Sequence, residues 1–226
     1  MAKIKDVVKA EEGEVFDVEL EKDVLRANRE IAQENRALLQ KHGVQAIDIM
    51  GAIGAGKTSL IEKLVDRLKS RYRIAAFKGD LTTTIDAEKI SRHNVQVVAI
   101  NTGKECHLDA NLVRKAFQKL NLDSIDLLLI ENVGNLICPA EFPLGSEKRM
   151  VIISVTEGPY MVVKHSFIFM DADVVVINKI DLTAAMDVNV ENLKADVKRI
   201  NPKAKIVSTN CRTGEGVDKV IEALGL

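Results

Sequence analysis

The chain has 226 residues, of which 46% are apolar and 29% are charged, and this composition excludes a disordered or fibrous protein. Its length suits one mixed α/β domain with a small appendage rather than several domains. The 32 basic and 33 acidic side chains leave a net charge of −1, so no bulk positive field exists to hold nucleic acid or an anionic membrane. We therefore expect neither of these as a partner.

The N-terminal sequence and the cysteine count indicate a cytoplasmic protein. The first residues lack the apolar run of a signal peptide, and no window reaches the about 18 apolar residues that span a bilayer. The three cysteines are odd in number, which argues against a disulfide scaffold. We expect reduced thiols at Cys106, Cys138 and Cys211.

An amphipathic helix is the first expected element, from about residue 17 to residue 42, with Gly43 as its C-cap. We expect the helical segment 1–43 to pack on a main domain of residues 44–226. A partner-binding arm is the alternative for this segment. The predicted apolar face of the helix consists of Leu20, Val24, Ala27, Ile31 and Leu38.

Short apolar, β-branched runs follow, separated by amphipathic stretches. Such unbroken apolar runs are typical of strands buried on both faces, and the stretches between them supply the crossover helices that parallel pairing requires. The sequence therefore predicts an α/β fold with a doubly wound, mostly parallel sheet of about seven strands flanked by helices. The predicted strands cover residues 47–50, 74–77, 95–100, 126–132, 150–155, 173–179 and 205–209.

A glycine-rich loop, GAIGAGKTS, comes directly after the first strand and before an amphipathic helix. The spacing GxxxxGK[ST] between strand and helix is typical of the P-loop of nucleotide-binding proteins, whose backbone N–H groups surround phosphates. Lys57 would reach the β and γ phosphates and Thr58 would bind Mg²⁺ through its hydroxyl. The predicted nucleotide-binding residues of this P-loop are Gly51, Gly54, Ala55, Gly56, Lys57, Thr58 and Ser59.

The segment Asn-Lys-Ile-Asp at residues 178–181 predicts guanine specificity. The carboxylate of Asp181 can accept two hydrogen bonds from guanine, Lys179 can lie along the ring, and Asn178 would tie this loop to the P-loop, so GTP is preferred over ATP. In the later loop 210–216, the backbone N–H of Cys211 would meet the guanine carbonyl, with Arg212 beside it. An ordinary turn between strand and helix is an equally good interpretation of that loop.

Three acidic residues are candidates for Mg²⁺ binding and catalysis. Glu131 ends a strand and would act with Mg²⁺ or orient the attacking water, while Gly134 would let a backbone N–H approach the γ phosphate. Asp80 follows the second strand and is a further Mg²⁺ candidate. Asp86, in a polar run, is the predicted water-positioning residue. A solvent-exposed loop acid is the alternative for both Asp80 and Asp86, and a helix cap is a further alternative for Asp86.

Two cysteines and a histidine form a candidate site for a soft metal. Cys106 and His107 are adjacent after a strand end, and Cys138 lies in the loop beyond Glu131. Thiolate and imidazole suit Zn²⁺ or Ni²⁺, whereas Mg²⁺ avoids them. Three ligands form a poor closed site, so a two-fold dimer could complete the coordination. Inert thiols are the alternative on the residues alone.

Six segments of the chain together resemble one known family. They are ANREIAQENRALLQKHGV, GAIGAGKTSLIEKL, NTGKECHLDA, IENVGNLICPAEFPLG, ISVTEG and INKIDL. The chain is similar through them to the HypB-type nickel-insertion GTPases of NiFe-hydrogenase maturation. These are SIMIBI-class metallochaperones related to the urease accessory GTPase, and the matches extend over nearly the whole chain.

The resemblance implies a P-loop GTPase with slow intrinsic turnover that binds GTP, Mg²⁺ and Ni²⁺ or Zn²⁺ and helps to insert nickel into NiFe hydrogenase. It implies a homodimer favoured by GTP and by metal, with Cys106, His107 and Cys138 at the interface. A hydrogenase maturation partner and the hydrogenase large subunit are the implied partners. A regulatory GTP-binding switch without metal delivery is the alternative. Only four histidines occur and no cysteine precedes Cys106, so nickel storage is not expected.

Overall fold

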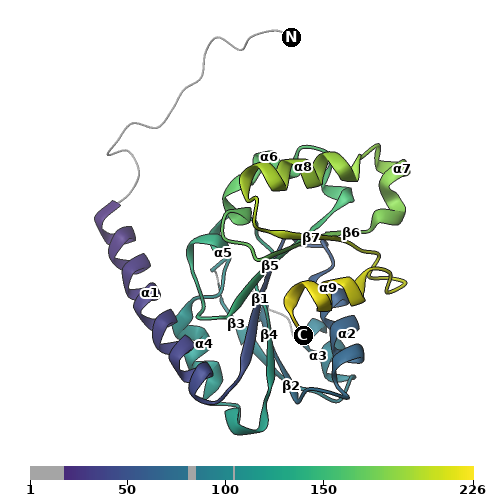
Figure 1. The fold of residues 1–226 in the computed structure, drawn as a ribbon. Coiled ribbons are helices and arrows are strands. Elements are labelled where there is room, and N and C mark those ends of the chain that lie inside the picture. The colour runs from purple at the N-terminus through teal and green to yellow at the C-terminus, as the bar shows by residue number, and fades with distance from the viewer. Residues whose placement is uncertain (1–17, 81–84, 104) are drawn as a thin grey trace.

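The fold is an α/β arrangement around one central sheet. The computed structural model describes residues 18–80, 85–103 and 105–226, with the backbone alone for residues 18–21, 85 and 86 (Figure 1). Seven strands lie in the order β3-β2-β4-β1-β5-β6-β7, and every neighbouring pair is parallel, which confirms the predicted fold class. The strands are β1 (Gln45–Met50), β2 (Ile74–Asp80), β3 (Gln96–Asn101), β4 (Leu127–Glu131), β5 (Lys148–Ser154), β6 (Val174–Asn178) and β7 (Lys205–Ser208).

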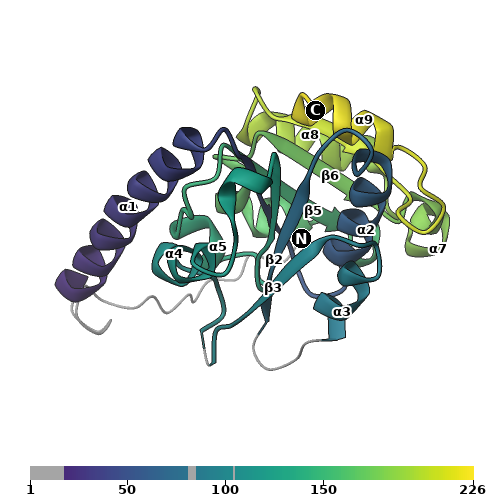
Figure 2. The same ribbon diagram turned by 90° about the horizontal axis from the view of Figure 1, so that it is seen from below.

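Helices cover both faces of the sheet (Figures 1 and 2). Three of them, α2, α3 and α9, pack on one face, and α1, α4, α6 and α8 pack on the other. The helices are α1 (Val18–Lys41), α2 (Lys57–Leu68), α3 (Ile85–Ser91), α4 (Ala110–Phe117), α5 (Cys138–Glu141), α6 (Met161–Lys164), α7 (Thr183–Met186), α8 (Val190–Ile200) and α9 (Val217–Leu224). None of the described helices is long and apolar enough to cross a membrane.

Strand β1 shows why the strand sequences are apolar without alternation. Successive side chains of a strand point to opposite faces. Ile47 and Ile49 pack in the hydrophobic core between the sheet and helices α2 and α9. Ala46 packs in the core on the opposite face, between the sheet and helices α1 and α4. Both faces are therefore buried, and one polar residue, Asp48, lies among them with no exposed surface.

Helix α1 packs on the domain through a face that coincides only in part with the one predicted. Leu38 packs against the core and Ile31 is half-buried, and the side chain of Leu20 lies outside the described residues. Val24 and Ala27 are exposed, and the buried side chains are those of Asn28, Ala32, Asn35 and Leu39. The two asparagines are buried because they bond to backbone groups of the domain. The amide of Asn28 donates to the carbonyl of Pro143, and that of Asn35 donates to the carbonyls of Ala110 and Leu144. The apolar pattern alone therefore gave the packed face of this helix only in part.

Candidate functional site

The P-loop runs from the end of β1 to the first residue of α2, and its glycines have backbone angles that other residues rarely adopt. The φ angle is +78° at Gly54 and +107° at Gly56. A Cβ atom at Gly56 would lie 2.3 Å from Nδ2 of Asn178, so only glycine fits there. The amide of Asn178 donates to the carbonyl of Ala55 at 2.9 Å, which holds the end of β6 against the P-loop.

A chain of polar contacts occupies the floor of the site. The ammonium group of Lys57 donates to the carbonyls of Gly51 and Ala52 at 3.0 and 2.9 Å. The hydroxyl of Thr58 donates to the two carboxylate oxygens of Glu131 at 2.8 and 3.1 Å. These hydroxyl and carboxylate oxygens are hard ligands of the kind that Mg²⁺ prefers, so their chemistry fits a Mg²⁺ site.

Lys78 is a second buried lysine at this floor. It lies near the end of β2, and its ammonium group is 2.9 Å from Oε1 of Glu131. Both side chains are almost fully buried, and ionised groups are rarely buried unless they are paired. Lys78 therefore gives Glu131 a buried ion-pair partner next to Thr58.

The loop after β7 meets the P-loop through Asn178. Oδ1 of Asn178 accepts the backbone N–H of Cys211 at 3.0 Å and the hydroxyl of Thr209 at 3.1 Å. The N–H of Cys211 is thus bonded within the protein, and its contact with the guanine carbonyl stays a prediction. Because the amide nitrogen of Asn178 is held by Ala55, its oxygen must face Cys211 and takes that hydrogen bond.

These loops line one cavity of about 610 Å³, within the range of about 300–1,000 Å³ that is usual for ligand sites. Gly51 and Ala55 are buried below its surface, and Asp181 lies at its exposed edge. The structure thus brings together most of the residues predicted for nucleotide and Mg²⁺. Those that line the cavity are Gly54, Gly56, Lys57, Thr58, Ser59, Asp80, Glu131, Gly134, Asn178, Lys179, Asp181, Cys211 and Arg212.

The two remaining acidic candidates differ in what the structure describes. Asp80 lines the cavity at the end of β2, and its backbone carbonyl accepts the N–H of Thr102 at 3.0 Å. The side chain of Asp86 lies outside the described residues, although its backbone is in the first turn of α3. The catalytic role of Asp86 therefore stays a prediction.

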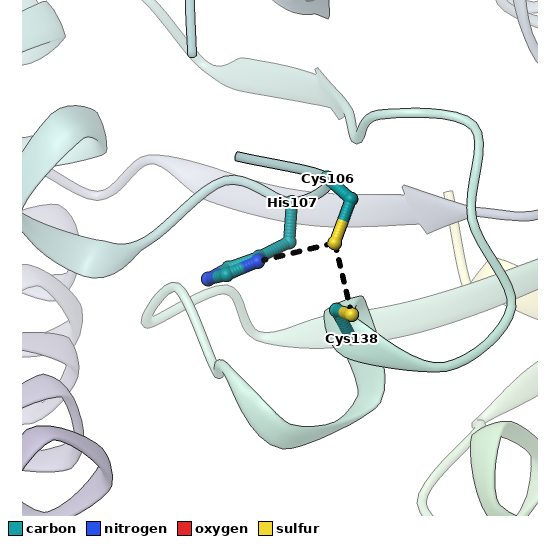
Figure 3. Close-up of side chains that lie close together, drawn as sticks. All are labelled: Cys106, His107 and Cys138. Carbon is teal, nitrogen blue, oxygen red and sulfur yellow. Dashed lines mark hydrogen bonds between the residues drawn. The ribbon is translucent and has the colours of Figure 1, made fainter. Parts of the chain in front are cut away.

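The three soft ligands lie together at the same edge of the sheet (Figure 3). Sγ of Cys106 is 3.0 Å from Sγ of Cys138 and 4.0 Å from Nδ1 of His107. All three ligand atoms lie within 4.8 Å of one another. Cys106 is exposed and the other two are half-buried. One ion can reach all three atoms, and two thiols with an imidazole suit Ni²⁺ or Zn²⁺.

The surroundings adjust the protonation of these ligands. Partial burial lowers the pKa of His107, and its ring stacks on Phe142 with 3.8 Å between the ring centroids. A lowered pKa favours the neutral imidazole, which is the form that binds a metal. Burial and the neighbouring Cys106 raise the pKa of the Cys138 thiol. Metal binding to Cys138 would therefore release a proton.

Comparison with known proteins gives the family. Residues 45–208 match the family described as CobW/HypB/UreG, nucleotide-binding domain. The chain belongs to this family. Over 205 residues it is 56% identical to the probable hydrogenase maturation factor HypB of Methanocaldococcus jannaschii, which covers 91% of this chain and 93% of that protein.

Solved HypB structures share the fold of this family member. The hydrogenase maturation factor HypB of Archaeoglobus fulgidus superposes with a TM-score of 0.83 at 46% identity, covering 88% of this chain and 98% of that one. HypB from Helicobacter pylori in complex with nickel gives a TM-score of 0.83 at 33% identity, covering 88% and 93%. The resemblance to HypB-type proteins is thereby confirmed.

The sequence predictions missed several residues that build the site of this CobW/HypB/UreG member. Lys78 carried a visible signal, because a lysine within the apolar run of a buried strand needs an acidic partner. Phe142, which stacks on His107, carried none, because nothing in its spacing indicates a ring contact. Asn132 and Asn135 were noted only as parts of a motif, and their contacts with the metal-ligand loop emerge from the three-dimensional structure.

Proposed function

We propose that the chain binds and hydrolyses GTP and acts as a metallochaperone that helps to insert nickel into NiFe hydrogenase. The observation that carries this proposal is the clustering of Cys106, His107 and Cys138 beside a P-loop cavity. Cys138 follows the end of β4 and the loop after it, whose residues Glu131 and Gly134 line that cavity. The nickel complex of the Helicobacter pylori protein supports nickel as the cargo. A hydrogenase maturation partner and the hydrogenase large subunit, in the cytoplasm, are then the partners, in keeping with the names of the relatives.

The nucleotide is GTP in this proposal. Asp181, exposed at the edge of the cavity, accepts the two donors of guanine, and Lys179 lies along the ring. Thr58, Glu131 and Asp80 supply oxygen ligands for Mg²⁺, which neutralises phosphate charge when bound. We assign these activities to a P-loop GTPase domain of residues 44–226. Of the predicted helical segment 1–43, residues 1–17 lie outside the described residues, and helix α1 packs on this domain.

Hydrolysis of GTP requires charge stabilisation and a positioned water rather than a strong base. Lys57 lines the cavity at the start of α2 and would stabilise the transferred phosphate. Glu131 and Asp86 would hold the attacking water. Slow intrinsic turnover is expected, as the resemblance to the HypB-type GTPases implies.

A homodimer would complete the metal site. Three ligands leave a coordination position open, and the exposed thiol of Cys106 can face a second copy. Ile53 in the P-loop and Ile137 beside Cys138 are 84% and 61% exposed, and apolar surface of this kind favours association. We propose that GTP and metal both favour this dimer.

Metal titration tests the proposed cargo site. Ni²⁺ and Zn²⁺ affinities of the nucleotide-free protein are compared with those of Cys106→Ala and Cys138→Ala. Changes near a metal ligand cost about 10- to 100-fold in affinity, so the loss of a ligand should cost more than about tenfold. Cys211→Ala is the matched control, since Cys211 is buried and burial raises the pKa of its thiol. Unchanged affinity in both test variants would overturn metal delivery and favour a nucleotide switch.

Sedimentation tests the dimer separately. The protein is examined with GDP, with a non-hydrolysable GTP analogue, and with Ni²⁺ added to each. We expect the largest dimer fraction with the analogue and Ni²⁺ together. A monomer under every condition would overturn the shared metal site while leaving GTP binding intact.

A further inference from the structure

The segment that carries two of the proposed metal ligands is held by two asparagines. Oδ1 of Asn132 accepts the backbone N–H of Leu108 at 3.0 Å. The amide of Asn135 donates to the backbone carbonyl of Cys106 at 3.3 Å. These hydrogen bonds lie on either side of His107, so they fix the backbone of the Cys106–His107 pair from both ends.

The same two asparagines belong to the loop that faces the nucleotide cavity. Asn132 directly follows Glu131, and Gly134 lines the cavity between the two asparagines. A Cβ atom at Gly134 would lie 2.4 Å from Cγ1 of Ile53 and 3.0 Å from its backbone nitrogen, so this loop packs closely on the P-loop. The backbone of Asn135 also forms an isolated bridge with Gly51. A displacement of either loop would therefore reach the asparagines.

Asn132 is fixed in orientation from its other side. It has no exposed surface, its side-chain amide donates to Oδ1 of Asp48 at 3.1 Å, and its backbone N–H donates to the carbonyl of Ile49. The amide nitrogen is thus committed to β1, and the oxygen must point to Leu108. A buried side chain held at both ends transmits a displacement instead of absorbing it by rotation.

We propose that Asn132 and Asn135 are positioning residues that couple the nucleotide state to metal affinity. In this proposal, the loop 131–135 and the segment 106–108 move together when the nucleotide changes, so that Cys106 and His107 shift relative to Cys138. The proposal rests on the proposed function, because it takes Cys106 and His107 as metal ligands. Coupling of this kind appears as a ratio of dissociation constants, typically about 5- to 150-fold.

The test compares Ni²⁺ affinity with GDP and with a non-hydrolysable GTP analogue, followed through thiolate-to-nickel absorption. Wild type should show different dissociation constants in the two states. In Asn132→Ala and Asn135→Ala the ratio should fall to within about twofold of unity. A purely structural loss would weaken Ni²⁺ binding equally in both states and leave the ratio unchanged. The ratio therefore reports coupling rather than folding.

Asn28→Ala is the matched control. Asn28 is also buried, and its Oδ1 accepts the backbone N–H of Ala110 at 2.8 Å while its amide donates to the carbonyl of Pro143 at 3.0 Å. Asn28 lies on α1 and holds the backbone at Ala110, just after the ligand segment, through hydrogen bonds of the same kind. The hydrogen bonds of its side chain go to Ala110 and Pro143 and not to the loop 131–135. Its substitution should leave the wild-type ratio intact.

The outcomes separate this inference from the proposed function. A wild-type ratio retained in both Asn132→Ala and Asn135→Ala, or a ratio near unity in wild type, would overturn the coupling role. If Asn132→Ala does not fold, Asn135→Ala carries the test, because Asn135 is only half-buried. Wild type that binds no Ni²⁺, or Cys106→Ala and Cys138→Ala that both bind as tightly as wild type, would overturn the proposed function and the inference with it.

Discussion

Asp48 is a buried carboxylate at the centre of the sheet, and it makes stability depend on pH. It lies on β1 between Ile130 of β4 and Arg149 of β5, which are its register partners. Oδ1 accepts the amide of Asn132, whereas Oδ2 is buried without a hydrogen-bond partner. Burial raises the pKa of Asp48 from 3.8 to about 6, although the charge of Arg149 and the hydrogen bond from Asn132 oppose the rise.

The sign of the effect follows from the raised pKa. Between about pH 4 and pH 6 the folded protein holds a proton on Asp48 that the unfolded chain has lost, so stability falls as the pH rises through this interval. One pKa unit corresponds to about 1.4 kcal/mol, which gives a total of about 3 kcal/mol. In Asp48→Asn this titration is absent. The difference in free energy of unfolding between Asp48→Asn and wild type should therefore grow by about 2.4 kcal/mol from pH 4 to pH 7, because part of the total change falls below pH 4.

Urea unfolding followed by circular dichroism at closely spaced pH values measures this difference. Any change in the interactions of Arg149 shifts the whole curve and does not alter its slope. Asp126→Asn is the control, because Arg73 lowers the pKa of Asp126 to about 2 and its contribution is lost only at more acidic pH. A difference between Asp48→Asn and wild type that stays constant from pH 4 to pH 7 would refute the reasoning.

Three further changes probe the cavity. Asp181→Asn should weaken binding of fluorescent GDP by about tenfold or more, because a charged acceptor is lost, and unchanged affinity would contradict guanine binding by this loop. Gly56→Ala should abolish binding in the same assay, since its Cβ would lie 2.3 Å from Nδ2 of Asn178; retained binding would count against this. Lys78→Met should lower the free energy of unfolding in urea by about 3–5 kcal/mol, because Glu131 loses its buried ion-pair partner. Addition of Glu131→Gln should recover most of this loss, and no recovery would contradict the ion-pair explanation.

The sheet and the P-loop could be predicted because their signals are local. A strand that is buried on both faces is recognised by its unbroken apolar sequence alone. The P-loop spacing likewise reflects backbone angles within a single turn. The face of α1 could not be predicted in this way. Asn28 and Asn35 are polar, and their burial depends on backbone carbonyls more than 70 residues away in the chain.

In the candidate site too, some features could be predicted from local sequence and others depend on contacts between distant segments. The residue types of Cys106, His107 and Cys138 indicated a soft metal, but their separation depends on two loops that only the fold brings together. The hydrogen bond from the Cys211 N–H to Asn178 was also beyond prediction, because the sequence does not show which acceptor this N–H meets. Hydrogen bonds between loops decide such cases, and they depend on the packing of the whole edge of the sheet.

The strand order explains how the nucleotide and metal-ligand loops come to meet. The carboxyl ends of parallel strands lie at one edge of the sheet. Strand β2 lies between β3, which precedes Cys106, and β4, which precedes Cys138. The loop after β3 must therefore cross β2, and it does so at Gly79, where a Cβ atom would lie 2.8 Å from Cγ of the fully buried Leu108. The absence of a side chain at Gly79 thus lets Leu108 reach Asn132 and places both cysteines on the same side of the nucleotide cavity.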